Sequence, residues 1–277
     1  MKRRPEGIDM VQVVDDPRKV ENAYAHQYEN LAREIASLVR TRSGILAEIG
    51  GGKGQLTIPL AKFLPHHRFD VVDTFTGAYS GTLIQLNKAL SGAKLTSRVK
   101  VHIADYLDWL WAEFSDKYAG VISSEFLPEI DSYELSMFLS ECYRIVRPGG
   151  LTVHSFLSPI GRNRRQRLMI EADRNPKWTR TPPKEWFSPK PALVLSELRR
   201  VGFRNLHIEK VKSNLIIKSD AARNFLYSWD VRSAFWKAHK LELVSEGLEV
   251  PDWVIVSGRK PRELGLGLKG FRRARRK

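Results

Sequence analysis

The sequence predicts an α/β fold in which one doubly wound, mostly parallel seven-stranded sheet carries helices on both faces. Three observations predict it. Short apolar runs of strand length alternate along the chain with amphipathic stretches of helix length, which is the pattern of parallel sheets with helical crossovers. A glycine-rich turn follows the first apolar run. The 277 residues, 42% of them hydrophobic, are enough for one sizeable core.

The first half of the chain contains most of this pattern. Asp16 followed by Pro17 is a typical helix start, and apolar residues at helical spacing extend that helix over about 17–41. Apolar runs then predict five buried strands, over 45–49, 69–73, 99–103, 119–123 and 151–156. The segments between them predict helices over 56–64, 82–90, 107–114 and 133–146.

The second half contains two insertions. An irregular basic segment, about 159–190, follows the fifth strand, and a helical one, about 218–250, precedes the last strand. Between and after them we expect a helix over 191–201, a strand over 206–211, a helix over 221–243 and a final, antiparallel strand over 253–257. The organisation expected is an irregular lead over 1–16, one domain over 17–260 with the two insertions as a cap, and a flexible basic tail over 261–277.

The positive charge is concentrated in two segments. The net charge is +15; residues 259–277 hold nine basic residues and one acid, and residues 159–190 hold nine basic residues and three acids. Such clustering favours contact with a polyanion, so nucleic-acid contact through 159–190 and 261–277 is one interpretation. A tail that only solubilises the protein is the other, since charge alone does not specify a partner.

Other classes of protein are disfavoured. No stretch approaches the ~20 apolar residues of a membrane span, and no apolar run follows the basic N-terminus as in a signal peptide. The single cysteine, Cys142, excludes an intrachain disulfide, so we expect a cytoplasmic protein. No metal site is expected, and the sequence does not set the oligomeric state.

The glycine-rich turn has the spacing acid-x-G-x-G-x-G, with Glu48, Gly50, Gly52 and Gly54 at the fixed positions. A phosphate-binding loop requires Ser or Thr after its lysine, but Gly54 follows Lys53. A dinucleotide-binding turn requires a third glycine at the position of Gln55. Both classes are excluded by spacing, which leaves a glycine-rich connector of another α/β protein as the bland alternative.

This turn resembles the first motif of class I, Rossmann-like, S-adenosylmethionine-dependent methyltransferases. The resemblance implies S-adenosyl-L-methionine as cofactor, with the glycine turn around its methionine part and Glu48 orienting its amino group. It also places Asp73, nineteen residues after Gly54, on the ribose hydroxyls, and Asp105 and Tyr106 at the adenine. The expected cofactor-binding residues are Glu48, Gly50, Gly51, Gly52, Gly54, Asp73, Thr74, Asp105, Tyr106 and Ser123.

Catalytic residues are harder to predict, because the sulfonium is already activated and needs mainly an aligned acceptor. Glu125, after the fourth strand, is one candidate, and His154 is a conceivable base, although an interior histidine with satisfied hydrogen bonds is the commoner case. Ser124-Glu125 followed by Glu134 also resembles the paired-glutamate loop of protein arginine methyltransferases, so such an activity is an alternative. Cys142, inside a predicted helix, does not read as a nucleophile.

The acceptor is expected to be an anionic small molecule or RNA. The candidate substrate-binding residues combine stacking and cationic side chains: Tyr24, Tyr28, Arg162, Arg164, Arg165, Trp178 and Trp186. Tyr24 and Tyr28, at i and i+4, also have the spacing of a simple packed pair on one helix face. A non-catalytic nucleic-acid-binding protein with a methyltransferase fold is the alternative from a different class.

Overall fold

The main sheet of the computed structural model, which describes residues 11–76, 81–180 and 189–262, has seven strands. Their spatial order is β4 (Val99–Ile103), β3 (His67–Asp73), β2 (Gly44–Ile49), β5 (Tyr118–Ser124), β6 (Val146–Leu157), β10 (Trp253–Arg259) and β7 (Arg204–Val211). The first five are parallel, and β10 runs antiparallel to both of its neighbours. The predicted fold class, including the antiparallel last strand, is confirmed.

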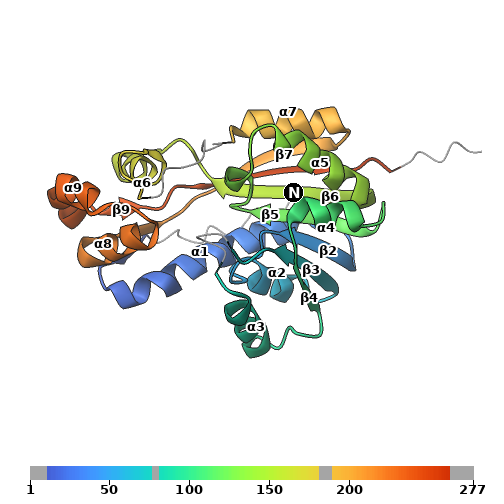
Figure 1. The fold of residues 1–277 in the computed structure, drawn as a ribbon, viewed down its shortest axis with the longest axis horizontal. Coiled ribbons are helices and arrows are strands. Elements are labelled where there is room, and N and C mark those ends of the chain that lie inside the picture. Colours follow the sequence, from blue (N-terminus) through green and yellow to red (C-terminus); the bar gives the residue numbers. More distant parts are fainter. Residues whose placement is uncertain (1–10, 77–80, 181–188, 263–277) are drawn as a thin grey trace, which may run out of the picture.

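Helices cover both faces of this sheet (Figure 1). One face carries α1 (Pro17–Leu38), α2 (Thr57–Phe63) and α3 (Leu83–Gly92); the other carries α4 (Tyr106–Ala112), α5 (Glu134–Ile145) and α7 (Pro191–Val201), with the short 3-10 turn η1 (Leu127–Glu129) before α5. The central strands are apolar because both of their faces are covered: Ala47 and Ile49 of β2 have no exposed surface.

Local sequence explains where the first helix begins. The Asp16 carboxylate accepts a hydrogen bond from the Arg18 backbone N–H at 3.0 Å, and Pro17 occupies the first helical position, where a missing N–H costs nothing. Leu31 and Ile35, one turn apart, are fully buried against the sheet. This helix therefore forms part of the core as well as a wall of the site described below.

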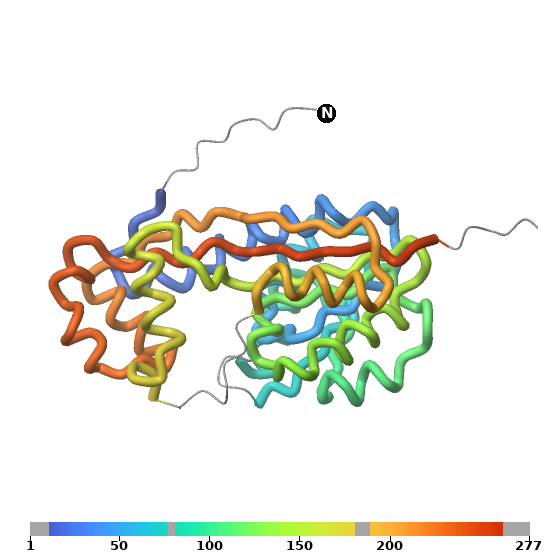
Figure 2. Tube along the Cα trace, turned by 90° about the horizontal axis from the view of Figure 1, so that it is seen from above, coloured from blue at the N-terminus to red at the C-terminus, as the bar shows by residue number. Residues whose placement is uncertain are grey.

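The remaining elements form a helical lobe at one end of the sheet (Figure 1). Its members are α6 (Arg164–Arg174), α8 (Ser219–Ser228), α9 (Ser233–Ser245) and a small sheet of β1 (Gln12–Val14), β8 (Leu215–Ile217) and β9 (Leu248–Glu249). Figure 2 shows β10 running from this lobe to the opposite end of the molecule.

Three details of the lobe differ from the prediction. Residues 12–14, expected to be irregular, form β1, because β8 pairs with them in parallel from more than two hundred residues away. The basic segment contains α6, which is capped by Asn163 and buries Leu168 and Met169. The helix expected over 221–243 is two helices, broken where Asp230 adopts a positive φ of 58°.

Candidate functional site

A cavity of about 560 Å³ lies between the carboxyl ends of β2, β3 and β5 and the helical lobe. In doubly wound sheets ligands bind at this edge. Eight of the residues singled out in the sequence line it: Tyr24, Tyr28, Glu48, Gly50, Gly51, Gly52, Asp73 and Glu125. We call it the acidic cavity, for the reason given below.

The glycine turn forms one wall of the acidic cavity. Gly50, Gly52 and Gly54 have φ values of 79°, 49° and 81°, a left-handed region that strongly favours glycine. Gly51 has no room for a side chain, since an added Cβ would lie 2.1 Å from Cγ1 of Val71. The Gly50 N–H donates to the carbonyl of Val72 at 2.9 Å, which ties the turn to β3. The result is bare backbone facing the cavity.

Glu48 presents a carboxylate without sufficient partners. Its side chain is 2% exposed, and its Oε2 atom has no hydrogen-bond partner among the described residues. Burial raises the pKa of Glu48 to about 8, and the nearby carboxylate of Asp73 adds to this rise, while the neighbouring Thr57 hydroxyl lowers it. A buried acceptor in this state fits a cationic ligand group, such as the ammonium of a methionine moiety.

Asp73, at the end of β3, holds the turn in place. Its Oδ2 accepts a hydrogen bond from the Gly52 N–H at 2.8 Å, and its Oδ1 accepts one from the Phe75 N–H at 2.7 Å. A carboxylate oxygen can accept a second hydrogen bond, so these contacts leave Asp73 able to bind ligand hydroxyls from the cavity.

Glu125 lies at the junction of β5, β6 and the helical lobe. Its φ is 56°, an uncommon backbone conformation for a residue other than glycine. Its Oε1 accepts a hydrogen bond of 2.5 Å from the backbone N–H of Leu157, and burial raises its pKa to about 8. The neighbouring carboxylate of Asp173 adds to this rise.

Acidic side chains dominate the lining, in contrast to the net positive charge of the protein. The acidic residues that line the cavity are Glu21, Glu48, Asp73, Glu125, Glu129 and Asp173; the basic ones are Lys53 and Arg174. Burial raises the pKa of Glu129 to about 7 and that of Asp173 to about 6. The cavity therefore favours a cationic occupant.

Aromatic rings form the wall opposite the glycine turn. Tyr24 packs against Tyr28, Phe225 and Trp229, with ring centroids 5.6, 5.7 and 6.1 Å apart. Nearby Glu125 raises the pKa of both tyrosines, although burial is the larger cause. Rings among carboxylates offer both cation–π and ionic contacts to a positively charged ligand.

Five of the predicted cofactor residues lie outside the lining. Asp105 caps α4, accepting a hydrogen bond from the Leu107 N–H at 2.8 Å. Tyr106 packs edge-on against Phe126, which does line the cavity, at 4.9 Å between ring centroids. Thr74 is exposed and accepts a hydrogen bond from Thr76. Gly54 closes the turn, its N–H donating to the Gly51 carbonyl at 2.9 Å.

The fifth, Ser123, shares a buried hydrogen-bond chain with His154. Nδ1 of His154 lies 2.8 Å from Oγ of Ser123, and Nε2 lies 2.8 Å from Oγ1 of Thr152. Burial lowers the pKa of His154 to about 3, so the ring is neutral at physiological pH. Both ring nitrogens are occupied, and neither residue lines the cavity.

Glu134, the second member of the suggested glutamate pair, does not line the cavity either. Its Oε2 accepts a hydrogen bond from the Asp131 N–H at 3.1 Å at the start of α5. The structure thus brings only Glu125 of this pair to the site.

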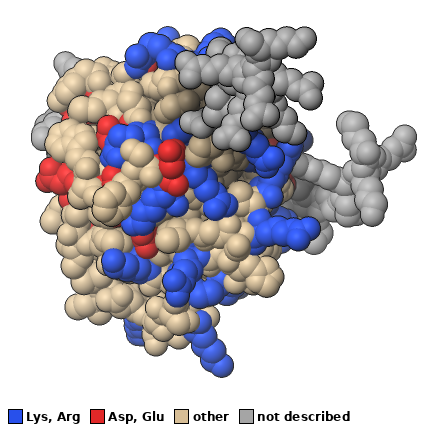
Figure 3. All heavy atoms as spheres, turned by 90° about the vertical axis from the view of Figure 1, so that its right-hand side faces the viewer, with Lys and Arg blue, Asp and Glu red and all other residues tan. Residues whose placement is uncertain are grey.

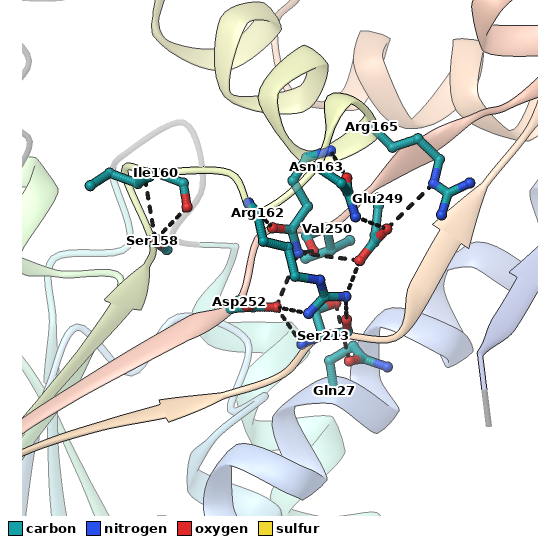
Figure 4. A network of polar contacts seen from close by, with 11 residues as sticks. Gln27, Ser158, Ile160, Arg162, Asn163, Arg165, Ser213, Glu249, Val250 and Asp252 are labelled. Carbon is teal, nitrogen blue, oxygen red and sulfur yellow. Dashed lines mark hydrogen bonds and ion pairs between the residues drawn. The ribbon is translucent and has the colours of Figure 1, made fainter. Parts of the chain in front are cut away.

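Three arginines of the basic segment, Arg162, Arg164 and Arg165, pair with acidic residues, and Figure 4 shows Arg162 and Arg165 beside Glu249. Arg162 lies between Glu249 and Asp252, forming an ion pair with each; its Nη1 is 2.6 Å from Oδ1 of Asp252. Arg165 pairs with Glu249 at 3.4 Å, and Arg164 pairs with Glu242 at 2.7 Å. Arg164 and Arg165 thus pair within the lobe, Arg162 also reaches Asp252 next to β10, and none of the three lines the cavity.

Trp178 also belongs to the interior of the lobe. It is 8% exposed, packs against Phe235 at 5.4 Å and donates to Glu171 from its ring nitrogen at 3.3 Å. Trp186 lies outside the described residues.

The lining residues that were not predicted from the sequence include Glu129, Asp173, Phe225 and Trp229. Asp173 lies among arginines in a basic segment, so the sequence did not indicate that it belongs to an acidic site. The aromatic residues of 221–243 were visible, but their alignment with Tyr24 depends on how α8 packs against α1, which no local pattern reveals.

The described part of the chain contains no group of three or more His, Cys, Asp or Glu residues placed to hold a metal ion. Within the same residues, no helix combines the length and apolar character needed to cross a membrane.

No protein-family model and no curated protein sequence matches the chain. Solved structures match its fold. A methyltransferase from Archaeoglobus fulgidus, described as S-adenosylmethionine-dependent, is 16% identical, with 85% of this chain and 94% of that chain covered and a TM-score of 0.54. Phosphoethanolamine N-methyltransferase 2 from Haemonchus contortus, in complex with phosphomonomethylethanolamine and S-adenosylhomocysteine, is 14% identical, with 87% of this chain and 57% of that chain covered and a TM-score of 0.54.

The chain thus has the Rossmann-like fold of S-adenosylmethionine-dependent methyltransferases. A cyclase shares this fold as well, at 15% identity with 84% and 82% covered and a TM-score of 0.54. The fold therefore does not by itself fix the reaction, which has to be argued from the site.

Proposed function

We propose that the protein is an S-adenosylmethionine-dependent methyltransferase whose acceptor is the nitrogen of a small cationic amine. The binding of S-adenosylmethionine is supported by the Oε2 atom of buried Glu48, which has no partner among the described residues and lies beside the side-chain-free backbone of the glycine turn. Glu48 would hold the ammonium of the cofactor, the turn would enclose its methionine part, and Asp73 would bind its ribose.

The acceptor class follows from the charge of the cavity. The sequence favoured an anionic acceptor because of its arginines, but Arg162, Arg164 and Arg165 are paired in the lobe. The cavity instead combines six carboxylates with the aromatic wall around Tyr24. An amine gains from both, whereas an anion would be repelled.

The cofactor supplies a methyl group activated on a sulfonium. The side chains then have two tasks, alignment and removal of a proton. Tyr24, Phe225 and Trp229 hold the acceptor against the cofactor. An amine attacks only with a free lone pair, so the ammonium has to lose a proton, and Glu125 is the carboxylate we assign to accept it. With a pKa of about 8, it is suited to exchange protons near neutral pH.

Calorimetry and label transfer test this proposal separately. We expect S-adenosylmethionine to bind, and label from its methyl group to enter small primary or secondary amines rather than carboxylic acids or RNA. Absence of cofactor binding at millimolar concentration would refute the methyltransferase assignment. Cofactor binding with transfer to carboxylic acids or RNA alone would refute the amine assignment and leave the enzyme class standing.

A further inference from the structure

A second cavity, of about 260 Å³, lies at the opposite edge of the same sheet. It is bounded by the end of α1, the start of β7 and the end of β10. Its lining contains five basic residues and no acidic one: Arg40, Arg204, Arg259, Lys260 and Arg262. We call it the basic cleft. Because β10 spans seven residues, the cleft lies about 20 Å from the acidic cavity.

The arginines of the basic cleft lack acidic partners such as those of the arginines in the helical lobe. Within the described ranges, Arg40, Arg204, Arg259 and Arg262 form no ion pair; only Lys260 does, with Asp116 at 2.7 Å. Burial, and then repulsion from Arg40, lowers the pKa of Arg259. The arginines of the helical lobe, in contrast, are matched to glutamates. Arg204 and Arg259 donate hydrogen bonds to backbone carbonyl groups, so their positive charge is not balanced by a carboxylate of the described residues and would attract an anionic ligand.

Positive charge also extends beyond the cleft along this edge. Arg42 and Arg68 are exposed at the starts of β2 and β3, and Arg147 lies at the start of β6. From β3 to β7 this edge is about 24 Å wide. Figure 3 shows that Lys and Arg side chains outnumber Asp and Glu on this face of the molecule. The following residues, 263–277, contain six more basic residues and one acid.

We propose that the basic cleft binds the phosphate groups of a nucleic-acid backbone. A cation track longer than one phosphate fits a linear polyanion better than a single small anion. Arginine guanidinium groups match phosphate geometry, with two parallel N–H donors each. The lining contains no aromatic ring on which a base could stack, so binding would be independent of sequence.

The site is independent of the proposed methyl transfer. Its residues lie at the amino ends of the parallel strands, and none of them lines the acidic cavity. Nucleic acid would be a docking partner and not the methyl acceptor. Failure of one proposal therefore does not affect the other.

The test measures anisotropy of a fluorescein-labelled single-stranded RNA of about twenty nucleotides with the full chain. For about four phosphate contacts, the slope of log K against log salt is about −3. The triple variant R40Q/R204Q/R262Q should weaken binding by about 10- to 100-fold and bring the slope about two units closer to zero. R40K/R204K/R262K keeps the charge and should keep most of the slope.

The matched control is K88Q/K237Q/K240Q, which removes the same charge from exposed lysines on α3 and α9. It should leave the slope unchanged. Equal losses in both glutamine variants would overturn the proposal, because they would indicate a response to net charge alone. Displacement of the RNA by inorganic phosphate at constant ionic strength would also overturn it, in favour of a site for a single small anion.

Discussion

Glu125 at the end of β5 accepts a hydrogen bond of 2.5 Å from the backbone N–H of Leu157 at the end of β6. This contact fixes a buried carboxylate between two adjacent strands, and the positive φ of Glu125 turns its side chain toward the cavity that it lines. Glu125, which we propose accepts the proton of the substrate, is thus held by the sheet and not by a loop alone.

Glu125→Gln is the direct test of that role. The glutamine carbonyl can still accept from Leu157, so thermal stability should be unchanged or slightly higher. Loss of the charge should lower kcat/KM for the amine by about 10- to 100-fold, the equivalent of one hydrogen bond to a charged group. Cofactor affinity should change by less than about twofold. Glu197→Gln, on α7 outside the cavity, is the control and should leave kinetics unchanged.

Glu48→Gln should instead weaken the cofactor. Its unpartnered Oε2 is assigned to the ammonium of S-adenosylmethionine, so the affinity measured by calorimetry should fall by about 10- to 100-fold. Unchanged affinity would show that the ammonium binds elsewhere. A product analogue that lacks the amino group should lose little on this substitution, since it never makes the contact.

The buried carboxylates also predict a pH dependence of stability. The pKa values of Glu48 and Glu125 are raised to about 8 in the folded protein, above their values in the unfolded chain. At a pH between the unfolded and the folded pKa, the folded state therefore binds more protons than the unfolded state. The free energy of unfolding should therefore fall as pH rises from about 6.5 to 8. His154, with its pKa lowered to about 3, opposes this trend only below about pH 6.5, where the unfolded histidine becomes charged.

Denaturant unfolding of the ligand-free protein at several pH values checks this. Glu48→Gln and Glu125→Gln should each flatten the decline, because glutamine does not titrate. A free energy of unfolding that rises from pH 6.5 to 8 would contradict the assigned pKa directions.

Gly51→Ala tests the packing of the glycine turn. The new Cβ would lie 2.1 Å from Cγ1 of Val71, so the turn has to move away from β3. We expect a loss of stability of about 1–3 kcal/mol, as for overpacking, together with weaker cofactor binding. The double variant Gly51→Ala, Val71→Ala removes the clashing methyl and should recover part of the affinity. No recovery would mean that the clash is not the cause.

Arg162→Ala tests how the lobe is attached. It leaves Glu249, which is 3% exposed, without its strongest partner, although Arg165 and Asn163 still reach that carboxylate. We expect a loss of about 2 kcal/mol, less than the loss of about 3–5 kcal/mol for breaking a fully buried pair, because Arg162 itself is partly exposed. Glu249→Gln introduced into the Arg162→Ala variant should lower the free energy of unfolding much less than Glu249→Gln in the unchanged protein. Additive losses would show that the two residues are not coupled.

The elements of the main sheet could be predicted because each buried parallel strand is an apolar run and each helix has its own periodicity. The glycine turn, Glu48 and Asp73 could be placed for a similar reason: they are set by spacing at the ends of predicted strands. Tyr24 and Tyr28 had the spacing of a packed pair, and they are both packed and part of the cavity wall.

The charge of the site could not be predicted because ion pairing is long-range. Arg162 pairs with Glu249 and Asp252, which lie 87 and 90 residues away, so acids far along the chain balance part of the charge of this basic segment. Asp173, in the same segment, faces the cavity and contributes the opposite sign. A local count of charges therefore does not show which arginines are paired in the fold.

The single strand β10 connects two ends of opposite polarity. Trp253 begins it beside the lobe that closes the acidic cavity, and Arg259 ends it in the basic cleft. A molecule with this charge separation has a permanent dipole along the strand, which a polyanion would align. A polyanion bound at Arg259 would hold the acidic cavity about 20 Å away along the strand, within reach of the amines that gather around it as counterions.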